Sequence, residues 1–172
     1  TEISQGRLEA LLNFQTVVSD LTAMPMANCS LLDEATAAAA AATMMLSLRS
    51  RAQQKAGATT LFVDKEIFPQ DLAGIRTRAV PQGIQVGTGD YADFEFTPEV
   101  FGCIIQYPNN SGSVEDYRAF VAKAHEAGCK VAVCADILSL TLLVPPGEWV
   151  IHFFKSYGSV FTVSGVDNCF GW

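Results

Sequence analysis

Three segments of this sequence place polar side chains where a buried element begins or ends. Asp136 directly follows the apolar run at 131–135, and an acidic group at the carboxyl end of a central strand lies where open α/β sheets place ligand contacts. A carboxylate there can keep the nitrogen of a heteroaromatic ring protonated, which strengthens that ring as an electron sink. The same carboxylate could instead cap the next helix, and the pattern alone leaves both roles open.

The second segment, residues 28–38, is a turn of small residues that opens a long helical pattern. Helix N-termini bind phosphate because free backbone N–H groups and the helix dipole both point there. The alternative is an ordinary N-cap by Ser30 or Asp33, and the segment alone favours that alternative.

The third segment, residues 106–112, follows the apolar run at 101–105. Its proline, asparagines and glycine predict a turn. The turn brings polar side chains to the same strand-end edge as Asp136.

Strands and helices must alternate along the chain to position these segments. β-like runs occur at 60–63, 84–87, 101–106 and 130–135, and helical patterns occur at 3–22, 33–55, 69–78 and 114–127. This order predicts an α/β domain with a mostly parallel sheet flanked by helices. The run at 131–135 is apolar without alternation, which predicts a strand covered on both faces.

Composition narrows the possible partners. The 172 residues are 49% hydrophobic and carry a net charge of −7 without a basic cluster, so we expect one domain and no nucleic-acid partner. The sequence holds no apolar stretch of the roughly 20 residues needed to span a bilayer, so we expect a soluble protein without a membrane partner. Five cysteines without a CxxC pair, and two histidines, argue against a metal site.

Long stretches of the sequence resemble glycine decarboxylase, the pyridoxal-phosphate (PLP) P-protein of the glycine cleavage system. They are EISQGRLEALLNFQT at 2–16, ANCSLLDEATAAA at 27–39, GCIIQYPNNSGSVEDY at 102–117 and ADILSLTLLVPPGEW at 135–149. The resemblance implies that residues 1–149 form part of the large domain of a fold-type I PLP-dependent transferase. It also implies an oxidoreductase that decarboxylates glycine and passes the aminomethyl group to a lipoyl-bearing H-protein. The parent enzyme would be a dimer of the mitochondrial matrix in a eukaryote, or of the cytoplasm in a bacterium.

The resemblance also implies contacts to the cofactor. The implied cofactor-binding residues are Glu34, Ala35, Thr36, Phe68, Tyr107 and Asp136. Residues 34–36 would hold the phosphate, Asp136 would pair with the pyridinium nitrogen, and Tyr107 would reach the phenolic oxygen. Phe68 stands where the family usually has a histidine that stacks on the ring, and a phenylalanine can stack there but cannot hydrogen-bond.

Two departures from the family limit what this chain should do alone. Residues 150–172 match nothing in the family, so we expect a non-family tail from translated intron or a frameshift; the alternative is a divergent terminal segment, in which 160–163 forms an edge strand. The lysine that forms the Schiff base in the family lies downstream of this region, so no catalytic residue is assigned here. We therefore expect an inactive enzyme fragment; the alternatives are a non-catalytic module that binds the cofactor or a subunit, and a gene-model artefact.

Overall fold

The computed structural model describes residues 2–28, 31–149, 153–156 and 160–163. The helices are α1 (Gln5–Thr22), α2 (Glu34–Ser47), α3 (Arg51–Lys55), α4 (Pro69–Ala79) and α5 (Arg118–Glu126). The strands are β1 (Met26–Ala27), β2 (Thr60–Asp64), β3 (Gln85–Gly89), β4 (Val100–Tyr107), β5 (Lys130–Ala135), β6 (Phe153–Ser156) and β7 (Val160–Val163). Residues 150–152, 157–159 and 164–172, which make up much of the expected non-family tail, lie outside the described part.

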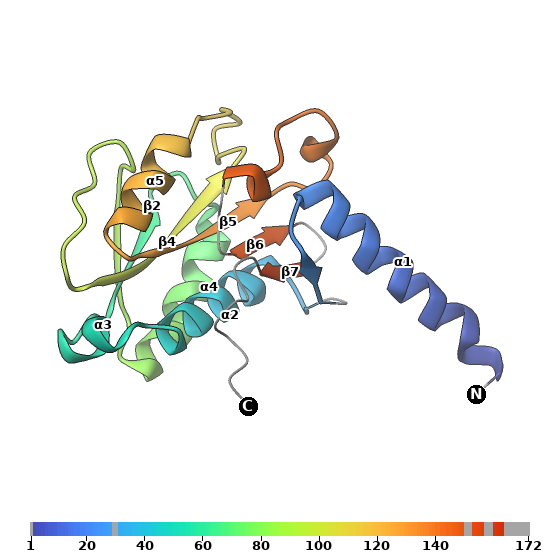
Figure 1. The fold of residues 1–172 in the computed structure, drawn as a ribbon, viewed down its shortest axis with the longest axis horizontal. Coiled ribbons are helices and arrows are strands. Elements are labelled where there is room, and N and C mark those ends of the chain that lie inside the picture. The colour runs from blue at the N-terminus through green and yellow to red at the C-terminus, as the bar shows by residue number, and fades with distance from the viewer. Residues whose placement is uncertain (1, 29–30, 150–152, 157–159, 164–172) are drawn as a thin grey trace.

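The strands form one mixed sheet in the order β1-β7-β6-β5-β4-β2-β3 (Figure 1). Strands β3, β2, β4, β5 and β6 run parallel, whereas β7 pairs antiparallel with β6 and β1 pairs antiparallel with β7. The expected α/β class with a mostly parallel sheet is confirmed. Residues 160–163 do form a strand, but it lies between β6 and β1 rather than at the edge of the sheet.

Helices cover both faces of the central strands. Helices α2 and α4 share one apolar cluster with Leu61 and Ile104, and α5 shares another with Ile105 and Val133 on the opposite face. This division follows from the alternation of side chains along each strand.

Helices α2 and α4 lie side by side and run parallel. A Cβ on Gly74 would lie 2.6 Å from the Cβ of Ala35, so the glycine is what allows this close approach. Further along, Nε2 of Gln82 donates to Oγ1 of Thr43 at 2.9 Å. Since α4 starts at the carboxyl end of β2, both helices point their N-termini toward the carboxyl edge of the sheet.

Two expected helices differ from the observed ones. The helix expected over 33–55 is interrupted between α2 and α3, because Ser50 starts a new helix with a capping box: its hydroxyl accepts from Gln53 N, and the Gln53 side chain accepts from Ser50 N. The helix expected from 114 begins only at Arg118. Before it, the carboxylate of Asp116 accepts from both the backbone and the guanidinium of Arg118.

Helix α1 projects away from the body of the molecule (Figure 1). Its periodicity predicts one buried face, but only Val18 and Thr22 are buried within the described chain. Leu8 and Leu12 are each 64% exposed, because nothing in the described chain packs against that part of the helix. Within the described residues, no helix combines the length and apolar character needed to cross a membrane.

Candidate functional site

A cavity of about 370 Å³ opens at the carboxyl edge of the sheet. We call it the strand-edge cavity, and it is lined by Phe68, Gln106, Pro108, Asn109 and Asp136. These residues come from the loop before α4, the end of β4 with its following turn, and the residue after β5. The cavity thus joins two of the segments that the sequence singled out.

Asp136 takes the capping role that its sequence position left open, while its role in ligand binding stays a prediction. Its carboxylate accepts hydrogen bonds from the backbone nitrogens of Leu138 at 3.3 Å and Ser139 at 3.1 Å, and so caps the short 3-10 helix Ser139–Thr141. The same side chain lines the cavity. A carboxylate group offers about four acceptor positions, so the two backbone hydrogen bonds leave it capacity for a ligand donor.

Phe68 is held at the cavity by the start of α4. It is the N-cap residue, and Pro69 follows at the first helical position, where its fixed φ suits the helix. Phe68 is half-buried and borders the cavity together with Asp136, as expected from the sequence.

Gln106 also lines the cavity, and the sequence did not single it out as a ligand contact. The residue is 3% exposed, and its Oε1 has no hydrogen-bond partner among the described residues. The sequence feature that could have identified Gln106 is its position as a single amide at the end of an otherwise apolar strand. The neighbouring amide of Asn109 differs, since its Oδ1 accepts from both Ser111 and Ser113.

The structure does not bring Tyr107 into this cavity. Its ring lies edge-on to Trp149 at a centroid distance of 4.6 Å, within the apolar cluster on the α5 side of the sheet. The reason is strand alternation: Gln106 and Tyr107 are adjacent, so their side chains leave opposite faces of β4. Tyr107 therefore lies outside the strand-edge cavity, and its contact with the cofactor stays a prediction.

Glu34, Ala35 and Thr36 begin α2 but do not line the cavity. The Oδ1 atom of Asp33 accepts the backbone N–H of Thr36 at 2.6 Å, so the N-cap alternative is realised by Asp33; Ser30, the other candidate, lies outside the described residues. A phosphate would meet the carboxylates of Asp33 and Glu34 at this helix end, and like charges repel. The described residues therefore fit the ring of PLP but not its phosphate.

The charged groups near the strand-edge cavity line another cavity, which we call the acidic cavity. Asp64, Lys65 and Asp90 line it, and Lys65 pairs with Asp90 at 2.7 Å. Burial is the main cause that raises the pKa of Asp64, although a hydrogen bond from Glu66 N opposes the shift. Among the described residues, no lysine lines the strand-edge cavity and no group of acidic, histidine or cysteine side chains is arranged to hold a metal ion.

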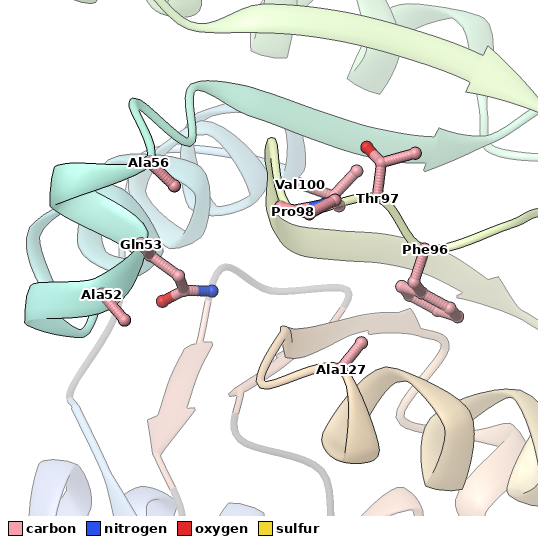
Figure 2. A pocket seen from close by; sticks show the side chains of 8 residues that line it. All are labelled: Ala52, Gln53, Ala56, Phe96, Thr97, Pro98, Val100 and Ala127. Atoms are coloured by element: carbon pink, nitrogen blue, oxygen red, sulfur yellow. The ribbon is translucent and has the colours of Figure 1, made fainter.

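A further cavity, of about 330 Å³, lies at the opposite, amino edge of the sheet (Figure 2). This amino-edge cavity is lined by Ala52, Gln53, Ala56, Phe96, Thr97, Pro98, Val100 and Ala127. None of these side chains is charged. The side-chain amide of Gln53 already has a hydrogen-bond partner, since its Nε2 donates to the carbonyl of Gly128 at 3.1 Å.

Comparison with known proteins identifies the family. The family model described as "Glycine cleavage system P-protein" matches residues 1–156. The chain belongs to this family. A "Glycine dehydrogenase (decarboxylating)" of Bacteroides thetaiotaomicron is 72% identical over 149 residues, which is 87% of this chain. The mitochondrial "Glycine dehydrogenase (decarboxylating)" of Dictyostelium discoideum is 51% identical over 148 residues.

The chain spans 16% of the length of the Bacteroides relative and 14% of the Dictyostelium relative. A crystal structure of glycine decarboxylase (P-protein) in inhibitor-bound form superposes with a TM-score of 0.80 at 26% identity, covering 94% of this P-protein chain and 40% of that one. A methionine gamma lyase of Micromonospora echinospora superposes with a TM-score of 0.70 at 18% identity, covering 91% of this chain and 44% of that one. The latter likeness shows a shared fold, that of the fold-type I PLP-dependent enzymes.

Proposed function

We propose that this P-protein chain is one portion of a PLP-dependent glycine decarboxylase and does not decarboxylate glycine alone. The observation that carries the proposal is the lining of the strand-edge cavity: Asp136 and Phe68 suit a pyridine ring, and no lysine stands among the lining residues that the structure describes. Of the described lysines, Lys65 is paired with Asp90 in the acidic cavity, and Lys130 begins β5 at the opposite edge of the sheet.

The proposed chemistry divides between the cofactor and the protein. PLP, when bound, supplies an electron sink for loss of carbon dioxide from glycine. Asp136 would keep the ring nitrogen protonated, and Phe68 would cover one face of the ring. Because the start of α2 is acidic rather than anion-binding, the phosphate contacts must come from elsewhere in the longer enzyme, as must the lysine.

In that longer enzyme, glycine is the proposed substrate and a lipoyl-bearing H-protein the proposed acceptor of the aminomethyl group. The test is glycine–bicarbonate exchange with purified chain, PLP and lipoyl carrier, with a full-length relative as the positive control. We expect exchange from the relative and background from the chain. Exchange by the chain alone, dependent on both PLP and the carrier, would overturn the proposal.

A second proposal, a module that binds another subunit, is supported by α1. Leu8, Leu12 and Val17 are all more than half exposed on this projecting helix, and such apolar surface commonly marks an interaction site. Mixing the chain with full-length relative should give a complex in light scattering, and replacing the two leucines by glutamine should weaken it. An unchanged complex would exclude α1 as the contact.

We further propose that the family-derived part ends near Trp149. The support is that the Bacteroides relative aligns over 149 residues, although the family model reaches residue 156. Transcripts across the Trp149 codon provide the test. An unspliced, uninterrupted reading frame encoding residues 150–172 in related genomes would contradict the intron explanation.

A further inference from the structure

Strand β3 forms one edge of the sheet, and part of its backbone faces away from the other strands. It pairs with β2 and with no other described strand. The amide of Gln85 points to the β2 side, where it donates to the carbonyl of Thr59 at 2.9 Å. Because backbone groups alternate in direction along a strand, Val86 and Thr88 present their N–H and C=O groups to the open side. The edge therefore offers donors and acceptors to another strand.

The sequence of β3 carries none of the usual obstacles to such pairing. Native sheets often protect an edge with charged side chains, proline or a bulge. The segment QVGTG has no charge and no proline, and it pairs with β2 without a register shift. The charge that follows the strand, on Asp90, is paired with Lys65 at 2.7 Å. The open side of β3 is thus free of an unpaired charge that would repel a second strand.

The spacing of the outward groups fits a second copy of the same strand. In an antiparallel pair, every second pair of opposed residues exchanges both backbone hydrogen bonds. A two-fold axis at Gly87 places Val86 opposite Thr88 of the second copy, and Thr88 opposite Val86, so that all of the outward groups are used. An axis at either neighbouring residue would leave half of these groups without a β3 residue opposite them. The strand is therefore self-complementary about Gly87.

The surroundings of Gly87 leave room for that arrangement. At the axis, opposed Cα atoms approach to about 4.5 Å, and a Cβ built on Gly87 meets no atom within 4 Å in the single chain. The opposite edge of the described sheet, strand β1, is two residues long. It does not match β3 for head-to-tail pairing, so the expected assembly closes as a dimer.

We infer that β3 is a self-association edge, and that two copies of this chain pair antiparallel through Val86 and Thr88 about a two-fold axis at Gly87. The inference goes beyond the proposed function, because it involves neither the strand-edge cavity nor the cofactor. It also differs from the proposed contact through α1. Because an edge contact of this kind is much smaller than a standard interface, we expect a dissociation constant of about 0.1–1 mM.

Amide exchange of the unmodified whole chain tests the contact without any substitution. Hydrogen-exchange rates would be measured by NMR at concentrations well below and well above the expected dissociation constant. The amides of Val86 and Thr88 should exchange at least about threefold more slowly at the high concentration, because pairing engages them. The amide of Gly87 faces β2 and serves as the internal control. Equal rates for Val86 and Thr88 at both concentrations would overturn the inference, as would sedimentation that shows only monomers or species larger than a dimer.

Charge variants separate β3 from other surfaces. Gly87→Lys and Gly87→Glu each place like charges opposite one another at the axis, so each variant alone should dimerise at least about fivefold more weakly. An equimolar mixture of the two should recover the native affinity. Gly6→Lys and Gly6→Glu on α1, where a Cβ also meets no atom within 4 Å, are the matched controls and should leave dimerisation unchanged. A mixture of Gly87 variants that stays monomeric, or weaker association in the Gly6 variants alone, would overturn the inference.

Discussion

Two cavities of similar size lie at opposite edges of the same sheet, and their chemistry differs. The strand-edge cavity, about 370 Å³, combines the Asp136 carboxylate with the unpaired amide oxygen of Gln106. The amino-edge cavity, about 330 Å³, is walled by alanines, Pro98 and Val100 (Figure 2). The amide of Gln53 at this cavity is already hydrogen-bonded to the carbonyl of Gly128. Cavity volume therefore does not distinguish the two edges, whereas polar groups that retain hydrogen-bonding capacity do.

The largest expected effect comes from exchanging one aromatic residue at each cavity. Phe96 contacts Phe94 and Phe120 with ring centroids 5.1 and 5.4 Å apart, so Phe96→Ala should cost about 2 kcal/mol of unfolding free energy without changing pyridoxine affinity. Phe68→Ala should cost less stability but weaken binding by about three- to tenfold. Urea unfolding and calorimetry on both variants measure the contrast. If only Phe96→Ala reduced the affinity for pyridoxine, the binding site would lie at the amino edge, which would contradict the proposal.

An intermediate effect is expected at Asp136, where capping and binding can be separated. Asp136→Ala should lose about 1 kcal/mol of stability, because the backbone nitrogens of Leu138 and Ser139 lose their acceptor. Asp136→Asn retains an acceptor for the cap but removes the charge, so it should restore most of the stability and not the affinity for a pyridinium ring. Full recovery of affinity in the asparagine variant would show that the carboxylate charge plays no part in binding.

The sequence located the cavity but could not assign every residue around it. Uniform apolar runs predicted β4 and β5 within about two residues. Strand-end reasoning placed Asp136 at the carboxyl edge of the sheet, whereas only the family resemblance placed Phe68 beside it. Which face of the sheet Gln106 and Tyr107 point to depends on the register of β4, because a shift of one residue moves each side chain to the opposite face. Ser50 and Gln53 have the spacing of a capping box, which indicates a new helix at this point, but the long alanine pattern predicted one continuous helix. For α1, periodicity indicates an apolar face but cannot say whether anything covers it.

The smallest expected effect is a pH dependence at the carboxyl edge. Burial raises the pKa of Asp64 above its ordinary value of 3.8, so the folded chain holds this proton more tightly than the unfolded chain. The resulting stabilisation is complete below pH 3.8 and is lost as pH rises through the higher folded pKa. The melting temperature of Asp64→Asn relative to the native chain should therefore rise with pH. A difference that stays constant from about pH 3 to pH 7, across the ordinary range of carboxyl titration, would contradict this sign.

The most direct test of the functional assignment is a chemical-shift map of the isotope-labelled chain titrated with pyridoxine. The strand-edge site predicts saturable changes that cluster at Phe68, Gln106, Asn109 and Asp136. Ala52, Ala56 and Ala127, around the amino-edge cavity, should stay unchanged. Changes centred on those alanines, or the absence of saturable changes anywhere, would contradict the assignment of the strand-edge cavity as the ring-binding site.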